Sequence, residues 1–118
     1  MLSEDGTTLS KGSDLIVHPK ASKIDIAAFG NGSALMCYSD EWGTQTGTCN
    51  ALTLSEDGTT LSKGSDLIVN PGNTVSISVA AFGSGSALMC YADGWLGNGT
   101  CNAIGCAKGT YSSIISFC

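Results

Sequence analysis

The sequence predicts an all-β domain, an antiparallel sandwich or flattened barrel built from two tandem repeats of about 52 residues. The first observation is a duplication, because the segment Leu2–Val17 returns letter for letter as Leu54–Val69. The second is that short segments alternate polar and apolar residues with a period of two, which is typical of half-buried strands. The third is that no segment keeps a helical period for more than a turn or two. A repeat of this length forms one supersecondary unit, and stacking two units buries the faces that each leaves open.

The duplication also sets the domain organisation. Gly32–Tyr38 recurs as Gly85–Tyr91, so the two copies extend through most of the chain. With 118 residues, of which 42% are hydrophobic, the chain can bury one core. We therefore expect a single β domain over residues 1–118, made of repeat one (2–53), repeat two (54–105) and a short C-terminal cap (106–118).

Strands and turns can be placed in order along repeat two. Asp57-Gly58 stands between alternating segments and predicts a hairpin turn, because glycine accepts a positive φ at little cost. Asn70-Pro71-Gly72-Asn73 predicts a further turn. Thr74–Ala80 then alternates with period two and is the clearest half-buried strand in the chain. Other strands are expected at Ala51–Ser55, Asp66–Val69, Ser86–Tyr91 and Gly99–Ile104.

Six cysteines predict that disulfide bridges staple this domain. Corresponding cysteines of two repeats should pair alike, which favours Cys37–Cys49 and Cys90–Cys101, and similar spacing favours Cys106–Cys118 in the cap. Each bridge would close a loop of about a dozen residues and contribute roughly 3 kcal/mol in the chain-entropy model. Free thiols in a cytosolic protein are the alternative. Since disulfides persist in oxidising compartments, we expect a secreted, extracellular protein.

Composition excludes several classes of partner. The net charge is −5, with five lysines and no arginine, so the chain lacks the basic face that neutralises nucleic-acid phosphates. No apolar run approaches the roughly 20 residues that span a bilayer, so membrane insertion is not expected. Low charge in a strand-rich chain leaves sheet edges that can pair with a neighbour, and self-association through exposed strand edges is therefore an expectation.

Catalysis is not expected from this sequence. A nucleophile needs an activating base, and the commonest base occurs once, at His18, where repeat two has Asn70. His18 precedes a proline and is interpreted as a turn residue. Adjacent carboxylates such as Asp40-Glu41 flank hairpin tips, whereas a glycosidase needs two acids facing each other across a cleft.

The candidate site residues lie in two corresponding loops that the cysteine bridges close. Each loop holds an aspartate and a tryptophan two residues apart, followed by a glycine and a side-chain amide. An aromatic platform beside carboxylate and amide groups suits sugar recognition. The candidate ligand-binding residues are Tyr38, Asp40, Trp42 and Gln45 in repeat one, and Tyr91, Asp93, Trp95 and Asn98 in repeat two.

Two alternatives compete for these loops. Each tryptophan could instead plug the core or pack on the disulfide, with the aspartate serving only as a turn former. A calcium site is a third interpretation, because carboxylates and carbonyls in glycine-rich loops are oxygen ligands. No cofactor is otherwise expected, and zinc is disfavoured because no C-x2-C pair occurs.

The expected function is a secreted, non-catalytic protein that binds carbohydrate or a cell-surface glycan through two equivalent loops. Two weak sites on one rigid body would gain affinity for multivalent glycans. The alternative is a structural subunit of an extracellular filament, sheath or surface layer. Repeat one lacks the neighbour that repeat two possesses, so its face should stand open. In a structural array the C-terminal repeat of another subunit would fill this gap head to tail, whereas in a soluble lectin Ala107–Phe117 of the same chain would close it.

Overall fold

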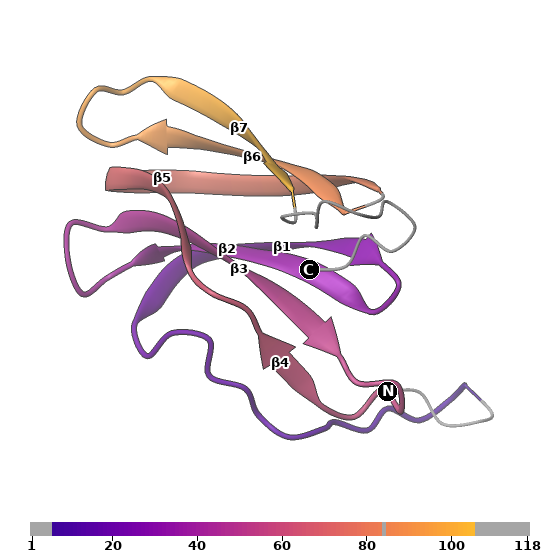
Figure 1. Ribbon diagram of the computed structural model, residues 1–118. Helices are drawn as coiled ribbons and strands as arrows, with labels where there is room; N and C mark the ends of the chain where they lie inside the picture. The colour runs from indigo at the N-terminus through magenta and orange to yellow at the C-terminus, as the bar shows by residue number, and fades with distance from the viewer. Residues whose placement is uncertain (1–5, 84, 106–118) are drawn as a thin grey trace.

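The computed structural model describes residues 6–83 and 85–105 and shows an antiparallel all-β fold (Figure 1). In this part of the chain seven strands form one sheet in the order β1-β2-β3-β5-β6-β7, with β4 paired to β3. The strands are β1 (Ala21–Gly30), β2 (Ser33–Asp40), β3 (Thr46–Leu54), β4 (Leu61–Lys63), β5 (Leu67–Gly83), β6 (Ser86–Asp93) and β7 (Gly99–Gly105). The all-β antiparallel prediction is confirmed. Among these residues the sheet stays open, which rules out the flattened barrel there.

Tight hairpins connect most neighbouring strands. Between β1 and β2 the turn uses three successive positive φ angles, at Gly30 (93°), Asn31 (55°) and Gly32 (76°). Glycine adopts this region freely, and asparagine is among the few other residues that tolerate it. Asn31 therefore supplies the middle position of this turn, between the two glycines.

Corresponding strands of the two repeats have corresponding registers. Cys37 lies opposite Cys49 in the β2–β3 pair, and Cys90 lies opposite Cys101 in the β6–β7 pair. The two predicted bridges, Cys37–Cys49 and Cys90–Cys101, are confirmed. The third predicted bridge, Cys106–Cys118, lies outside the described residues.

The β1–β2 and β5–β6 pairs also share an irregularity. Their registers shift between Ser22 and Asp25 in β1 and between Val75 and Ser78 in β5. At both shifts a residue other than glycine has a positive φ, Lys23 at 54° and Ser76 at 55°. A β-bulge of this kind sharpens the local twist of a strand.

The long strand β5 joins the two parts of the sheet. Its first residues pair with β3, where Leu67 lies opposite Cys49, and its later residues pair with β6, where Ser78 lies opposite Cys90. In Figure 1, β5, β6 and β7 lie above β1, β2 and β3. The sequence predicted two strands separated by a turn at residues 70–73, and this separation is wrong. Hydrogen-bonding partners on both sides keep the chain extended through Pro71, with two register shifts against β3 absorbing the irregularity.

The core lies between these two parts of the sheet. The lower part contributes Phe29, Leu35, Cys37 and Cys49, and the upper part contributes Ala87, Met89, Tyr91 and Ile104. The sulfur atoms of Cys49 and Met89 lie 3.5 Å apart across the interface. Burying one large apolar side chain contributes roughly 1.5–3 kcal/mol, so this contact holds the two parts together.

One polar contact crosses the core as well. The Asp25 carboxylate (Oδ2) accepts the backbone N–H of Val79 at 2.8 Å, next to the register shift of β5. A buried amide without a partner is costly, so this hydrogen bond supports the bulge.

Candidate functional site

The two predicted loops are the β2–β3 and β6–β7 hairpin turns, and both lie at the same end of the molecule (left in Figure 1). The tryptophan of each loop is exposed to solvent, with 68% of Trp42 and 67% of Trp95 accessible. Tryptophan side chains exposed to this extent are unusual, because tryptophan is highly buried on average. The interpretation that these tryptophans plug the core is therefore wrong.

In the first loop, Asp40 organises the chain around Trp42. One oxygen of its carboxylate (Oδ1) accepts the N–H of Trp42 at 2.9 Å, and the other (Oδ2) lies 3.2 Å from His18 Nε2. His18 Nδ1 accepts the N–H of Lys20 at 2.9 Å, which assigns the ring proton to Nε2 and lets it donate to Asp40. The imidazole stands edge-on to the indole of Trp42, with ring centroids 5.3 Å apart.

In the second loop, Asp93 makes the corresponding turn. Its Oδ1 accepts the N–H groups of Trp95 at 2.9 Å and Leu96 at 3.1 Å. The indole of Trp95 lies against the backbone of Gly72, where an added Cβ would come within 2.9 Å of the ring. Trp95 thus stacks on glycine backbone, where Trp42 contacts an imidazole.

The segment Pro71–Thr74 connects the two loops. On one side, the Thr44 hydroxyl donates to the Pro71 carbonyl at 3.1 Å, and the N–H of Thr74 donates to the Gln45 carbonyl at 3.0 Å. On the other side, the N–H of Gly94 donates to the carbonyl of Asn73 at 2.8 Å. Both loops therefore border one segment and form one continuous end surface.

The remaining predicted residues are divided between the surface and the interior. Asn98 is exposed and its carbonyl accepts the N–H of Asp93 at 2.9 Å, while Gln45 Nε2 donates to Glu41 Oε1 at 3.4 Å. Tyr38 and Tyr91 are buried, so these two rings lie beneath the loops and do not line their outer surface.

Tyr38 is a support for the first loop. Its hydroxyl donates to Asn50 Oδ1 at 2.8 Å, and its ring faces His18 at a centroid distance of 5.5 Å. Burial, together with the negative charges of Asp66 and Asp40, raises the pKa of Tyr38 to about 12. The neutral phenol is thus the form that the fold accommodates.

Two residues of this end surface were missed by the sequence interpretation. His18, interpreted from the sequence only as a turn residue, contacts the indole of Trp42 and pairs with Asp40. Glu41 accepts hydrogen bonds from Gln45 and from Ser22, and its carboxylate lies 3.9 Å from Lys23 Nζ. One signal was available, since His18 is the first position at which the duplicated segments differ.

The end surface offers carboxylates but little that would hold a metal. Over residues 6–83 and 85–105, no three histidine, cysteine or acidic side chains come together as a metal-binding group. No helix in the same residues is long and apolar enough to cross a membrane.

Comparison with known proteins adds no family. The chain matches no protein-family model, no curated protein and no solved structure.

Proposed function

We propose that this protein is a secreted, non-catalytic protein that binds carbohydrate or a cell-surface glycan through its two tryptophan loops. The exposure of both indole rings carries this proposal. An exposed aromatic ring costs solvation free energy unless it meets an apolar partner, and the C–H face of a sugar ring is such a partner. The two bridges that support the loops are consistent with an extracellular location.

The polar groups of the end surface fit the same ligand class. Glu41, Asp93 and the exposed side chain of Asn98 present oxygen acceptors and an amide donor beside the two rings. Hydroxyl-rich ligands need such groups to fix their orientation, while the aromatic rings supply contact area. Because both loops border Pro71–Thr74, one extended glycan could reach both rings.

The surroundings of His18 support a non-catalytic role. The His18–Asp40 pair resembles a base with its orienting group, but Nδ1, the acceptor nitrogen of this ring, already accepts the N–H of Lys20. An activated hydroxyl would need to donate to the imidazole instead.

We further propose that the two tandem repeats are equivalent units of a sandwich and that each contributes one loop. The matching registers of the two cysteine pairs and the matching bulges at Lys23 and Ser76 support this proposal. It implies that the two loops bind similar chemical groups with different strengths, since His18 supports one ring and Gly72 the other.

A glycan array with the variants Trp42→Ala, Trp95→Ala and the double variant tests the function. Each single change should weaken multivalent binding on the order of 10-fold to 100-fold, the range of an aromatic hot spot, and the double change should abolish it. Thermal stability should change little, because both rings are exposed. Ile68→Ala is the matched control, because Ile68 is also exposed, at 62%, but lies outside the loops. An array without any binding, or equal losses in the control, would contradict the proposal.

The second candidate is a structural subunit of an extracellular filament, sheath or surface layer. One observation favours it: large apolar side chains away from the loops are exposed, among them Ile26 at 60% and Phe82 at 70%. A monomer of this size rarely exposes so many large apolar groups without a partner.

A further inference from the structure

Each repeat has two sheet faces, and the two repeats do not bury the same one in the contact between the two parts of the sheet. Residues of repeat two that point into the core, such as Val79 and Met89, correspond to Ile26 and Met36 of repeat one, which point away from it. Residues of repeat one that point into the core, such as Phe29, correspond to residues of repeat two that point away from it, such as Phe82. The packing of repeat two on repeat one is therefore head to tail, and within residues 6–83 and 85–105 it leaves one face of each kind open.

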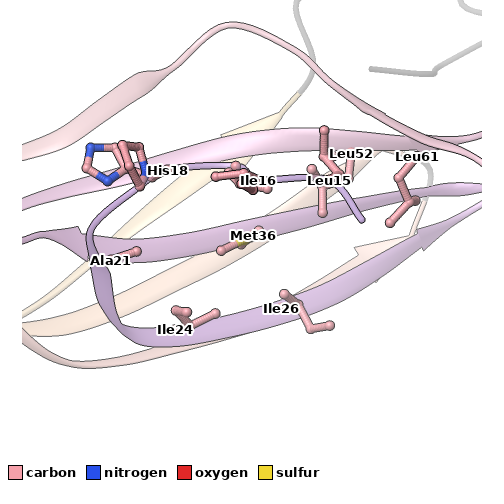
Figure 2. A pocket seen from close by; sticks show the side chains of 11 residues that line it. Leu15, Ile16, His18, Ala21, Ile24, Ile26, Met36, Leu52 and Leu61 are labelled. Atoms are coloured by element: carbon pink, nitrogen blue, oxygen red, sulfur yellow. The ribbon is translucent and has the colours of Figure 1, made fainter. Parts of the chain in front are cut away.

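The open face of repeat one is a groove of about 540 Å³ (Figure 2). We call it the groove face, defined by Ile24, Ile26, Met36, Leu52 and Leu61. Leu15, Ile16 and Val17 of the N-terminal segment also line it. Ile24 is 55% exposed and Ile26 is 60% exposed, whereas Ile77 and Val79, which correspond to them, pack against the core.

The open face of repeat two is the reverse side of β5, β6 and β7. We call it the outer disulfide face, defined by Phe82, Leu88, Cys90, Cys101 and Ala103. Phe82 is 70% exposed, whereas the corresponding Phe29 is 7% exposed in the core. Cys101 is exposed, whereas the corresponding Cys49 is 1% exposed.

A pair of glycines shows that the outer disulfide face has room for a partner. In repeat one, Gly47 lies so close to Thr74 of repeat two that an added Cβ would meet its side chain at 2.8 Å. Gly99 is the corresponding glycine of repeat two, and no atom of the described part of the chain lies within 4 Å of the Cβ position there. Glycine at this position thus permits a close contact between the repeats at Gly47, whereas no described residue covers Gly99.

The outer edges of the corresponding strands β3 and β7 also differ in whether a strand pairs with them. The outer edge of β3 is occupied by β4 and by the start of β5, that is, by the segment from Leu61 to Asn70. No strand of residues 6–83 or 85–105 pairs with the corresponding edge of β7. Leu9–Val17 carries the same letters as Leu61–Val69, and its Leu9 and Ile16 are 77% and 75% exposed.

We propose that copies of this chain associate head to tail, with the groove face of one copy packed on the outer disulfide face of the next. The partner is a second copy because the chain already contains this contact once, between faces built from corresponding residues. In the assembly, Leu15–Val17 leave the groove of their own copy, and the segment Leu9–Val17 adds to the β7 edge of the neighbour, as Leu61–Val69 adds to β3. A contact between unlike faces does not close on itself in two copies, so it propagates into a filament. This inference rests on the second candidate function and is independent of glycan binding.

Two single variants and their mixture test the proposal in the full chain. Ile26→Asp blocks the groove face, Phe82→Asp blocks the outer disulfide face, and both positions are exposed in the single copy. By light scattering, the unaltered chain should gain mass as its concentration rises, and each variant alone should lose this gain and stay at the mass of one chain. An equimolar mixture of the two variants should form a complex of twice that mass, because one intact face of each kind remains. Leu96→Asp, at a residue 74% exposed in the second loop, is the matched control and should assemble like the unaltered chain.

Several outcomes would overturn the proposal. They are an unaltered chain that stays monomeric at every concentration, a mixture that forms no complex, and a Phe82→Asp variant that still dimerises, which would show pairing of like faces. Circular dichroism melting checks that the variants fold, and Ile24→Asp replaces Ile26→Asp should the latter melt early.

Hydrogen exchange gives a second measurement, since amides of β7 and of Ile16–Val17 should gain protection on assembly. Glycan binding by Phe82→Asp is measured in parallel, so a failure to assemble is distinguishable from a failure of the tryptophan loops.

Discussion

Two segments of this chain have identical sequences and different structures. Residues 58–69 contain β4 and the start of β5, whereas residues 6–17 contain only an isolated bridge at Leu9. The difference lies in what precedes each copy. The second copy follows β3, whose edge offers partners, such that Leu54 lies opposite Leu61 and Leu52 opposite Lys63. Strand formation here is thus decided by an available edge, and local sequence preference alone does not decide it.

The same contrast extends to side chains. Cys37 and Cys49 are buried between the two parts of the sheet, while Cys101 is exposed on the outer disulfide face. Corresponding cysteines therefore form the same kind of bridge in both repeats but differ in burial. Comparing matched substitutions in the two repeats separates these contributions, because the local sequence is nearly constant.

The largest effect is expected from removing the bridges. The double variants Cys37→Ala/Cys49→Ala and Cys90→Ala/Cys101→Ala open loops of almost equal length, with sequence separations of 12 and 11. Each should lose about 3 kcal/mol of unfolding free energy through loop entropy. The first should lose roughly 1–2 kcal/mol more, because it leaves a cavity in the core. Urea unfolding without reductant measures both, and equal losses would show that burial adds nothing.

The next effect concerns the pH dependence of stability and Tyr38. Its pKa of about 12 in the fold exceeds the ordinary value of about 10, because burial disfavours the phenolate. The unfolded chain therefore releases this proton first as the pH rises. The contribution of Tyr38 to the free energy of unfolding is fully present below pH 10. It decreases as the pH rises towards 12, by up to about 3 kcal/mol.

Thermal melts between pH 9 and pH 12 measure this loss, in a range that covers the titration of an ordinary tyrosine. Tyr38→Phe is the control, because it keeps the ring and removes the titrating hydroxyl. It should start slightly less stable, by about 1 kcal/mol, since the Asn50 amide loses a partner. Its stability should then fall less steeply with pH. An unchanged slope would mean that other groups account for the alkaline loss.

The sequence was sufficient for the all-β antiparallel class, because that class depends on local patterns. The period-two alternation of Thr74–Ala80 and the paired cysteines correctly predicted antiparallel strands and two bridges. The break predicted at Asn70–Asn73 failed because β3 and β6 hold the two ends of β5 in one strand. Which face of each repeat is buried could not be predicted, since both repeats carry apolar residues on both faces and only the stacking selects between them.

The candidate site divides in the same way. Trp42, Asp40, Trp95 and Asp93 were predicted as loop residues, because a short Asp-x-Trp pattern forms its turn locally through the aspartate side chain. The proximity of the two loops was not predicted, because it depends on the crossing of β5 between them. His18 was likewise underestimated, since its contact with Trp42 joins residues 24 positions apart.

The smallest effect is expected from substituting one aspartate in each of the two identical segments, Asp14 and Asp66. These aspartates occupy the same position of the duplicated segment but have different partners. Asp66 Oδ1 accepts a hydrogen bond at 2.7 Å from the buried amide of Asn50, and this bond is the main cause that lowers the pKa of Asp66. Asp14 pairs only on the surface, with Lys11 at 3.0 Å, both side chains being more than 80% exposed.

Asp66→Ala should therefore lower the free energy of unfolding by about 1–2 kcal/mol, because it removes a partner from a buried amide donor. Asp14→Ala should lower it by less than about 0.5 kcal/mol, as expected for an exposed ion pair. The pKa of Asp66 is lowered in the fold, so the contribution of its carboxylate is present above the unfolded pKa and fades as the pH falls below it. Urea unfolding at pH 7 and pH 3 measures both variants, and the difference between them should shrink at pH 3. Equal effects at pH 7 would show that the two copies of this segment have the same surroundings in solution, contrary to the asymmetry on which the head-to-tail contact depends.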